Sequence, residues 1–337
     1  MKKYNVAILG ATGAVGKEML KILGERNFPI NELKLLASKK SAGGEVDFLG
    51  KKYIVEEATE NSFENIDVML CAAENDISKL LSPAAVKAGA VVIDNSSAYR
   101  MDENVPLVVP EVNPEDVKNH KGIIANPNCS TIIALTAVNE LNKYAKINRM
   151  IVSTFQAVSG AGINGIKELD KQIKDISEGK KAEVNIFQYQ IAYNLIPQIG
   201  NFDEMGYSEE EMKMQNEGRK IFHNKDLKVN CTCVRVPVYR SHSESITIET
   251  EKEITPEKAM ELLRNAKGVK LVDDLQNRKY PMPLDTSDQD LIYVGRIRKD
   301  ISSNNSLVLW CCGDQIRKGA ATNAVQIAEV LVKENLI

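Results

Sequence analysis

The chain has 337 residues, which is long enough for two domains with well-filled cores. Its 43 basic and 46 acidic side chains leave a formal net charge of -3, so there is no electrostatic reason to expect nucleic acid or a membrane surface as a partner. No apolar run approaches the ~20 residues that a membrane helix needs, and the first residues lack the features of a signal peptide.

Short apolar strands alternate with helices in the first part of the chain. Continuous apolar strands separated by helices are typical of a parallel sheet that is covered on both faces. The pattern therefore predicts an α/β domain over residues 1–128. We expect its strands at residues 6–9, 33–37, 68–72 and 90–94 and its helices at residues 14–26 and 77–88.

A glycine-rich loop, residues 10–16, joins the first strand to the first helix. Its spacing is Gly-x-x-Gly-x-x-Gly rather than Gly-x-Gly-x-x-Gly, but it lies between strand and helix, as the dinucleotide fingerprint requires. Glycines there let the backbone approach a pyrophosphate, and the helix N-terminus attracts the anion. We predict a Rossmann-type nucleotide-binding domain; a turn used only for tight packing is the alternative. The expected cofactor contacts in the loop are Gly10, Thr12, Gly13, Ala14 and Val15.

The turn after the second strand bears on the choice of cofactor. A ribose 2′-hydroxyl needs an Asp or Glu at this place, whereas this chain has Ser38, Lys39, Lys40 and Ser41. Hydroxyl and ammonium groups suit a 2′-phosphate, so we expect NADP, bound by Ser38, Lys40 and Ser41. An ordinary solvated basic turn is the alternative.

The second part of the chain has the pattern of an α+β domain with a mostly antiparallel sheet, which we place at residues 129–315. The final helix, residues 319–334, carries an apolar stripe, and we expect residues 316–337 to return to the first domain. The expected strands are residues 149–159, 229–239, 243–251, 290–298 and 306–312, and the expected helices are residues 165–177 and 208–222.

Cys129 lies between an apolar strand at residues 122–125 and a helical run at residues 132–138. The thiol is therefore expected at a helix N-terminus, where unpaired N–H groups and the helix dipole favour a thiolate. A thiolate in such a place is a nucleophile. The alternative is a buried small hydrophobic residue, which is the usual role of a free cysteine.

The other five cysteines are expected in the core. Cys231 and Cys233 alternate on a strand, but a lone Cys-x-Cys without further ligands is a poor zinc site, so we predict no metal. Six thiols also fit a reducing compartment, and we expect a cytoplasmic protein.

Five segments of the chain form a longer set of motifs: residues 10–16, 94–101, 126–131, 156–162 and 235–244. Together these motifs resemble those of the aspartate-semialdehyde dehydrogenase family, in the family's order and over essentially the whole chain. The resemblance implies reversible, NADP-dependent reductive dephosphorylation of L-aspartyl 4-phosphate to L-aspartate 4-semialdehyde. That step leads to lysine, threonine, methionine and diaminopimelate. A homodimer, in some members a dimer of dimers, is also implied.

The same resemblance implies roles for individual residues. Cys129 attacks the acyl phosphate, His242 is the acid and base because a histidine titrates near neutral pH, and Gln156 orients the substrate. Read alone, His242 and Gln156 are polar strand ends with no role. The remaining implied substrate ligands are Arg235 for the carboxylate, Glu217 for the ammonium group, Lys220 and Arg100 for the phosphate, and Asn128. Ser159, Gly160 and Asn323 match positions near the nicotinamide.

The sequence spacing of two residue pairs limits how these residues can reach one site. Arg235 and His242 are seven residues apart and would point to opposite faces of an unbroken strand, so a bulge or bend near Pro237 is required. Glu217 and Lys220 are three apart on a helix and share a face, but an exposed helical ion pair explains that spacing equally well.

Two other functions remain as alternatives. N-acetyl-γ-glutamyl-phosphate reductases share the architecture and the thiol chemistry, but they carry an aromatic residue after the cysteine, where this chain has Ser130. A non-catalytic nucleotide-binding regulator on the same fold is the second alternative. It would be expected to lack the thiol or the histidine, and both are present.

Overall fold

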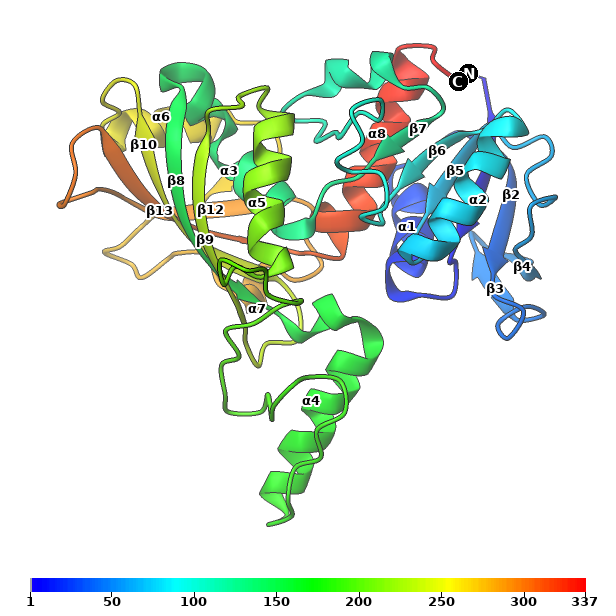
Figure 1. Ribbon diagram of the computed structural model, residues 1–337, viewed down its shortest axis with the longest axis horizontal. Helices are drawn as coiled ribbons and strands as arrows, with labels where there is room; N and C mark the ends of the chain where they lie inside the picture. The colour runs from blue at the N-terminus through cyan, green and yellow to red at the C-terminus, as the bar shows by residue number, and fades with distance from the viewer. Residues whose placement is uncertain (1) are drawn as a thin grey trace. The chain divides into compact units, whose positions relative to one another are not determined.

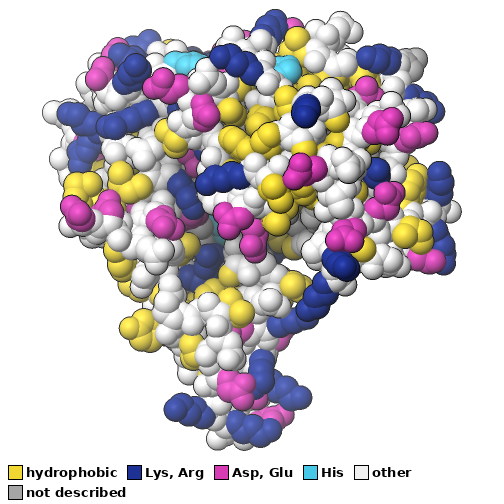
Figure 2. Space-filling model, turned by 45° about the vertical axis from the view of Figure 1, so that its right-hand side comes forward, with side chains coloured by type: hydrophobic (Ala, Val, Ile, Leu, Met, Phe, Trp, Pro, Cys, Tyr) yellow, Lys and Arg dark blue, Asp and Glu magenta, His cyan; other side chains and the backbone are white. Residues whose placement is uncertain are grey.

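The computed structural model describes residues 2–337, which form two compact units. Among the described residues, unit 1 comprises residues 2–128 and Ala320–Ile337, and unit 2 comprises Cys129–Gly319. None of the helices in the described range is long and apolar enough to cross a membrane. Acidic and basic side chains are interspersed over the face of the molecule shown in Figure 2.

Unit 1 is built around a seven-stranded sheet in the order β3-β4-β2-β1-β5-β6-β7. All neighbouring strands pair in parallel except β3 and β4, which form an antiparallel hairpin. The predicted parallel sheet is confirmed. The strands are β1 (Tyr4–Leu9), β2 (Ile30–Ala37), β3 (Glu45–Phe48), β4 (Lys51–Glu57), β5 (Val68–Cys71), β6 (Val91–Asp94) and β7 (Ile123–Ala125).

Helices cover both faces of this sheet (Figure 1). On one face, Ile8 of β1 packs in one cluster with α1 (Ala14–Glu25) and α8 (Thr322–Lys333). On the other face, Leu9 packs in a cluster with α2 (Asn75–Lys87). Successive side chains of a strand point to opposite faces, which is why the apolar run of β1 is buried throughout. A short 3-10 helix, η1 (Pro114–Asn119), completes this unit.

Unit 2 contains a six-stranded mixed sheet in the order β11-β12-β13-β10-β8-β9. The three central pairings are antiparallel, and the outer pairs β11–β12 and β8–β9 are parallel. This confirms the predicted mostly antiparallel sheet. The strands are β8 (Ile147–Gln156), β9 (Lys228–Arg235), β10 (His242–Thr250), β11 (Val269–Leu271), β12 (Ile292–Lys299) and β13 (Ser306–Gly313).

The helices of unit 2 fall into two groups. The buried α3 (Cys129–Ala145) contacts the sheet and α5 (Glu209–Ile221), and α6 (Pro256–Arg264) contacts α3. By contrast, α4 (Gly162–Ser177) extends away from the sheet in Figure 1 and packs with its own small apolar cluster around Leu169. The short elements are η2 (Val158–Ala161), α7 (Pro283–Thr286) and η3 (Arg317–Ala321), a single turn of π-helix.

Candidate active site

Cys129 is the first residue of α3, so its side chain lies at a helix N-terminus. It is partly exposed, whereas the other five cysteines are buried. The π-helical turn after β13 brings Gly319 against it, and a Cβ on Gly319 would lie 2.9 Å from the Cβ of Cys129. Accessibility and the helix N-terminus together distinguish this thiol from the structural ones.

Gln156 and His242 lie at the adjacent ends of two paired strands. Gln156 is the last residue of β8 and His242 is the first residue of β10, and both side chains are buried. The Nδ1 atom of His242 accepts the backbone N–H of Ala157 at 3.0 Å. Its Nε2 atom lies 3.3 Å from the amide nitrogen of Gln156. The two side chains therefore form one polar cluster at this edge of the sheet.

Arg235 joins this cluster from the last position of β9, directly opposite Gln156 in the parallel β8–β9 register. Its Nη1 donates to the carbonyl oxygen of Ala157 at 2.7 Å. A Cβ on Gly160 would lie 2.7 Å from that nitrogen, so a larger residue there would require the guanidinium to move. Burial lowers the pKa of Arg235, an effect opposed by the negative charges of Glu210 and Cys129. Cys129 is thus within electrostatic range of the cluster.

The chain bends between Arg235 and His242. The expected strand at residues 229–239 ends at Arg235, and β10 begins only at His242. Between them Ser241 adopts a φ of 75°, and its backbone N–H donates to the side chain of Gln315 at 2.8 Å. The bend that the seven-residue interval requires is present, and it lets both side chains contact Ala157.

The environment of His242 corrects the expectation of a near-neutral pKa. The ring is fully buried, and burial lowers its pKa to about 3, with a further lowering by Arg235 and an opposing effect of Glu210. The imidazole is therefore neutral at pH 7 in this arrangement. Burial disfavours the charged imidazolium, so His242 does not supply a positive charge to the cluster.

Glu217 and Lys220 lie on α5, where Glu217 is only 1% exposed and Lys220 is half-buried. An exposed helical ion pair is therefore the wrong description of Glu217. In the first turn of the same helix, the buried Glu210 accepts a hydrogen bond from the amide nitrogen of Gln156 at 3.1 Å. Glu210 could not be predicted from the sequence, because 54 residues separate it from Gln156 and no spacing rule connects them.

The glycine-rich loop of unit 1 depends on two of its glycines for packing. Gly10 has a φ of 84°, and a Cβ on it would lie 2.5 Å from the carbonyl oxygen of Ala72. A Cβ on Gly16 would lie 2.2 Å from the carbonyl oxygen of Gly10. Gly13 is the N-cap of α1 and provides no side-chain cap. The first amides of the helix are thus left to an anion or to water, which fits a cofactor pyrophosphate.

The cofactor turn follows β2 as expected. Ser38 and Lys40 are exposed and Ser41 is half-buried, and the backbone N–H of Ser41 donates to the carbonyl of Ser38 at 2.8 Å. Both interpretations of this turn, a 2′-phosphate site and a solvated basic turn, fit these contacts.

The remaining predicted residues of unit 1 surround the segment before Cys129. The buried Arg100 donates to the backbone oxygen of Asn126 at 3.0 Å and to that of Asn95 at 2.8 Å. Asn323 of α8 donates to the side chain of Asn126 at 2.7 Å, and Asn128 is buried. In unit 2, Ser159 lies in η2 and accepts a hydrogen bond from Gln315.

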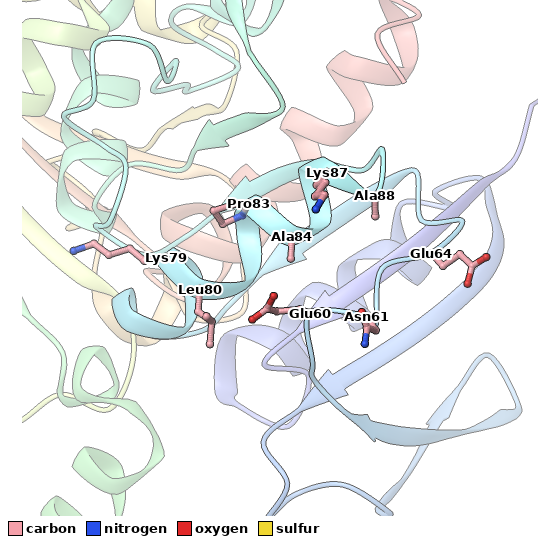
Figure 3. A pocket seen from close by; sticks show the side chains of 9 residues that line it. All are labelled: Glu60, Asn61, Glu64, Lys79, Leu80, Pro83, Ala84, Lys87 and Ala88. Atoms are coloured by element: carbon pink, nitrogen blue, oxygen red, sulfur yellow. The ribbon is translucent and has the colours of Figure 1, made fainter.

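A separate groove of about 860 Å³ lies in unit 1 between α2 and the turn at residues 60–64 (Figure 3). It is lined by residues of α2 and by Glu60, Asn61 and Glu64, and it contains none of the predicted site residues. We do not include it in the candidate site.

Comparison with known proteins identifies the family. Residues 5–120 match the NAD binding domain of semialdehyde dehydrogenases, and residues 139–318 match their dimerisation domain. The aspartate-semialdehyde dehydrogenase of Aquifex aeolicus is 55% identical, with 99% of both chains covered. The chain belongs to the aspartate-semialdehyde dehydrogenase family. This confirms the family inferred from the motifs and makes the chain an oxidoreductase.

Solved structures agree with membership of the aspartate-semialdehyde dehydrogenase family. The Vibrio cholerae aspartate semialdehyde dehydrogenase II, described as complexed with ASA, has a TM-score of 0.97 and 46% identity, with 99% of each chain covered. The Candida albicans aspartate semialdehyde dehydrogenase with NADP has a TM-score of 0.78 and 25% identity, with 100% of each chain covered. These relatives support a nicotinamide-nucleotide cofactor and do not favour the N-acetyl-γ-glutamyl-phosphate reductase or regulator alternatives.

Proposed function

We propose that this enzyme interconverts L-aspartyl 4-phosphate and L-aspartate 4-semialdehyde through a thioester on Cys129, with NADP as cofactor. The observation that carries the proposal is the accessible thiol at the start of α3, within electrostatic range of the buried cluster of Arg235, His242 and Gln156. The Vibrio cholerae relative, described as complexed with ASA, supports the choice of substrate.

In the reductive direction the sulfur of Cys129 attacks the acyl carbon of aspartyl phosphate, and phosphate leaves with the electron pair of the broken C–O bond. The nicotinamide cofactor supplies the hydride for the next step. The thiohemiacetal oxygen then carries negative charge, and the Nε2–H of the neutral His242 donates a hydrogen bond to it until that oxygen becomes the carbonyl oxygen of the semialdehyde. Breaking the C–S bond releases the semialdehyde and returns the thiolate on Cys129.

Substrate recognition follows from charge. Arg235 suits the α-carboxylate, because a guanidinium fork binds a carboxylate through two donors. Glu217 suits the α-ammonium group, because its buried carboxylate can accept hydrogen bonds from an ammonium group. We assign Lys220 and Arg100 to the phosphate and Asn128 to the bound acyl group.

For the cofactor, we assign the pyrophosphate to the loop at residues 10–16 and the 2′-phosphate to Ser38, Lys40 and Ser41. Ser159, Gly160 and Asn323 are assigned to the nicotinamide end. The Candida albicans relative with NADP supports this choice over NAD. The match of unit 2 to a dimerisation domain supports a homodimer. We place the reaction in the cytoplasm, in biosynthesis of lysine, threonine, methionine and diaminopimelate.

Phosphate dependence tests the proposal. In the oxidative direction a thioester forms on Cys129, and phosphate must cleave it. Steady turnover of aspartate semialdehyde with NADP should therefore require phosphate. In phosphate-free buffer we expect one burst of NADPH per active site and then no further reaction, the signature of acyl-enzyme accumulation.

Two variants assign the phosphate ligands. Arg100→Ala and Lys220→Ala should each raise the KM for phosphate more than the KM for NADP. Lys225→Ala, an exposed lysine just after α5, is the matched control and should change neither. Full-rate oxidation without phosphate, giving free aspartate, would show that water is the acceptor. Turnover of N-acetylglutamate semialdehyde in place of aspartate semialdehyde would refute the substrate assignment.

A further inference from the structure

Glu210 has no role in the mechanism above, yet its carboxylate is buried beside the catalytic cluster. It lies in the first turn of α5, where the helix dipole favours a negative charge. Its Oε1 accepts from the amide nitrogen of Gln156 at 3.1 Å, and its Oε2 lies 3.0 Å from the ammonium nitrogen of Lys213. The two oxygens of this carboxylate thus face hydrogen-bond donors, the Gln156 amide and the Lys213 ammonium group.

This contact determines which way the Gln156 amide faces. The amide oxygen accepts from the hydroxyl of Thr154 at 3.0 Å, while the amide nitrogen faces Glu210. If the amide were reversed, its oxygen would face the carboxylate of Glu210, and two acceptors would meet. The hydroxyl of Thr154 can donate or accept, so it does not itself decide the orientation. Glu210 is therefore the group that decides it.

The fixed amide in turn determines what His242 can do. The backbone N–H of Ala157 occupies Nδ1 of the ring, so the proton of the neutral imidazole lies on Nε2. The amide nitrogen of Gln156 is 3.3 Å from that Nε2. Both atoms carry N–H groups, so neither satisfies the other. Two N–H donors are thus held side by side.

We propose that Glu210 is a positioning residue that prevents the Gln156 amide from turning its oxygen to His242. With the amide reversed, Gln156 would accept the Nε2–H of His242, and the two groups would satisfy each other. With Glu210 in place, both N–H groups remain available for the oxygen that becomes negative in the thiohemiacetal. This role rests on the proposed function, because it requires an acyl group on Cys129.

The Glu210→Gln variant tests the proposal, because glutamine has the same shape but can donate a hydrogen bond. Gln156 is then free to reverse, and we expect kcat to fall by about 10- to 100-fold, less than the ~10²–10³ lost when an oxyanion donor is removed. The KM for aspartate semialdehyde should change little. Glu209→Gln, an exposed glutamate in the same helical turn, is the matched control and should leave kcat unchanged.

A double-mutant cycle separates positioning from a structural role. In a Gln156→Met background there is no amide to orient, so adding Glu210→Gln should cause no further loss of kcat. Full additivity of the two losses would overturn the proposal. So would a Glu210→Gln enzyme with wild-type kcat.

A nitrogen-15 NMR measurement on the free protein needs no turnover. The Nε2–H of His242 should gain a hydrogen bond in Glu210→Gln, seen as a downfield shift of its proton, while Nδ1 stays unprotonated. An unchanged signal would refute the reversal. If wild-type protein failed to turn over aspartate semialdehyde while Glu210→Gln still showed this shift, the proposed substrate would be wrong and the positioning of Gln156 would stand.

Discussion

The side chains of His242 and Arg235 form hydrogen bonds to the two backbone polar groups of one residue, Ala157, which follows β8. The imidazole accepts the backbone N–H of Ala157 at 3.0 Å, and the guanidinium donates to its carbonyl oxygen at 2.7 Å. One residue therefore fixes the tautomer of the histidine and the position of the cation beside it. The closeness of this cation contributes to the low pKa of His242.

The nucleophile can be tested by chemical labelling. Iodoacetamide should modify Cys129 ahead of the five other cysteines, because they are buried and Cys129 is partly exposed at a helix N-terminus. Cys129→Ser should fold and bind NADP but lose nearly all turnover, since a hydroxyl is far less ionised than a thiol at pH 7. Cys231→Ser, which changes a buried cysteine, is the control, and this variant should still be labelled at Cys129. Even labelling of all six cysteines together with an active Cys129→Ser enzyme would refute the assignment.

The carboxylate ligand can be tested by a change that keeps its charge. Arg235→Lys retains a cation but loses the fork and the donor to the carbonyl of Ala157. We expect kcat/KM for aspartate semialdehyde to fall by about 1.5–3 kcal/mol, the scale of a hydrogen bond to a charged group. Arg149→Lys, which affects a more exposed pair with Glu249, is the control. Equal kcat/KM for wild type and Arg235→Lys would show that Arg235 does not bind the substrate carboxylate.

Much of the fold could be predicted because its signals are local. The run of apolar residues in β1, the glycine-rich loop and the start of α1 are contiguous in the chain, so their arrangement is evident from the sequence. The hairpin of β3 and β4 was missed because it is short and mostly exposed, and its charged residues give no apolar pattern. Strand β9 is shorter than predicted because the chain bends immediately after Arg235.

The candidate site was less predictable, because its properties depend on distant residues. The sequence motifs identify Cys129, Gln156 and His242 as candidate site residues. The low pKa of His242, however, depends on burial and on Arg235. Glu210 meets Gln156 across 54 residues, and only the packing of α5 on the sheet brings them together. Long-range burial and charge of this kind leave no periodic pattern in the sequence.

The choice of cofactor can be tested at the turn after β2. Lys40→Glu should weaken NADP far more than NAD, because only NADP carries the 2′-phosphate. A charge pair at 4 Å is worth about 1 kcal/mol in water, so reversing one charge should cost ~2 kcal/mol, or about 30-fold in Kd. Lys87→Glu on α2 changes the net charge equally and is the control. An equal loss of both nucleotides would mean that Lys40 does not contact the ribose phosphate.

Glu244 is a fully buried residue of β10 that pairs across the sheet with Thr154 and Cys311. Neither carboxyl oxygen has a hydrogen-bond partner among residues 2–337. Burial raises its pKa well above the usual value, and the nearby Cys233 and Glu210 raise it further. The folded protein therefore keeps this proton at a pH where the unfolded chain, with a pKa of about 4.3, has lost it.

Because the unfolded state then binds fewer protons than the folded state, this group makes the protein less stable as pH rises above about 4.3 and up to its folded pKa. Glu244→Gln removes the titration. We expect the free energy of unfolding of Glu244→Gln, measured in urea, to exceed that of wild type by an amount that grows between pH 5 and pH 8. Glu253→Gln, at an exposed position shortly after the end of β10, should run parallel to wild type. A constant difference between Glu244→Gln and wild type across this range would show that the Glu244 carboxyl does not carry a raised pKa in the folded protein.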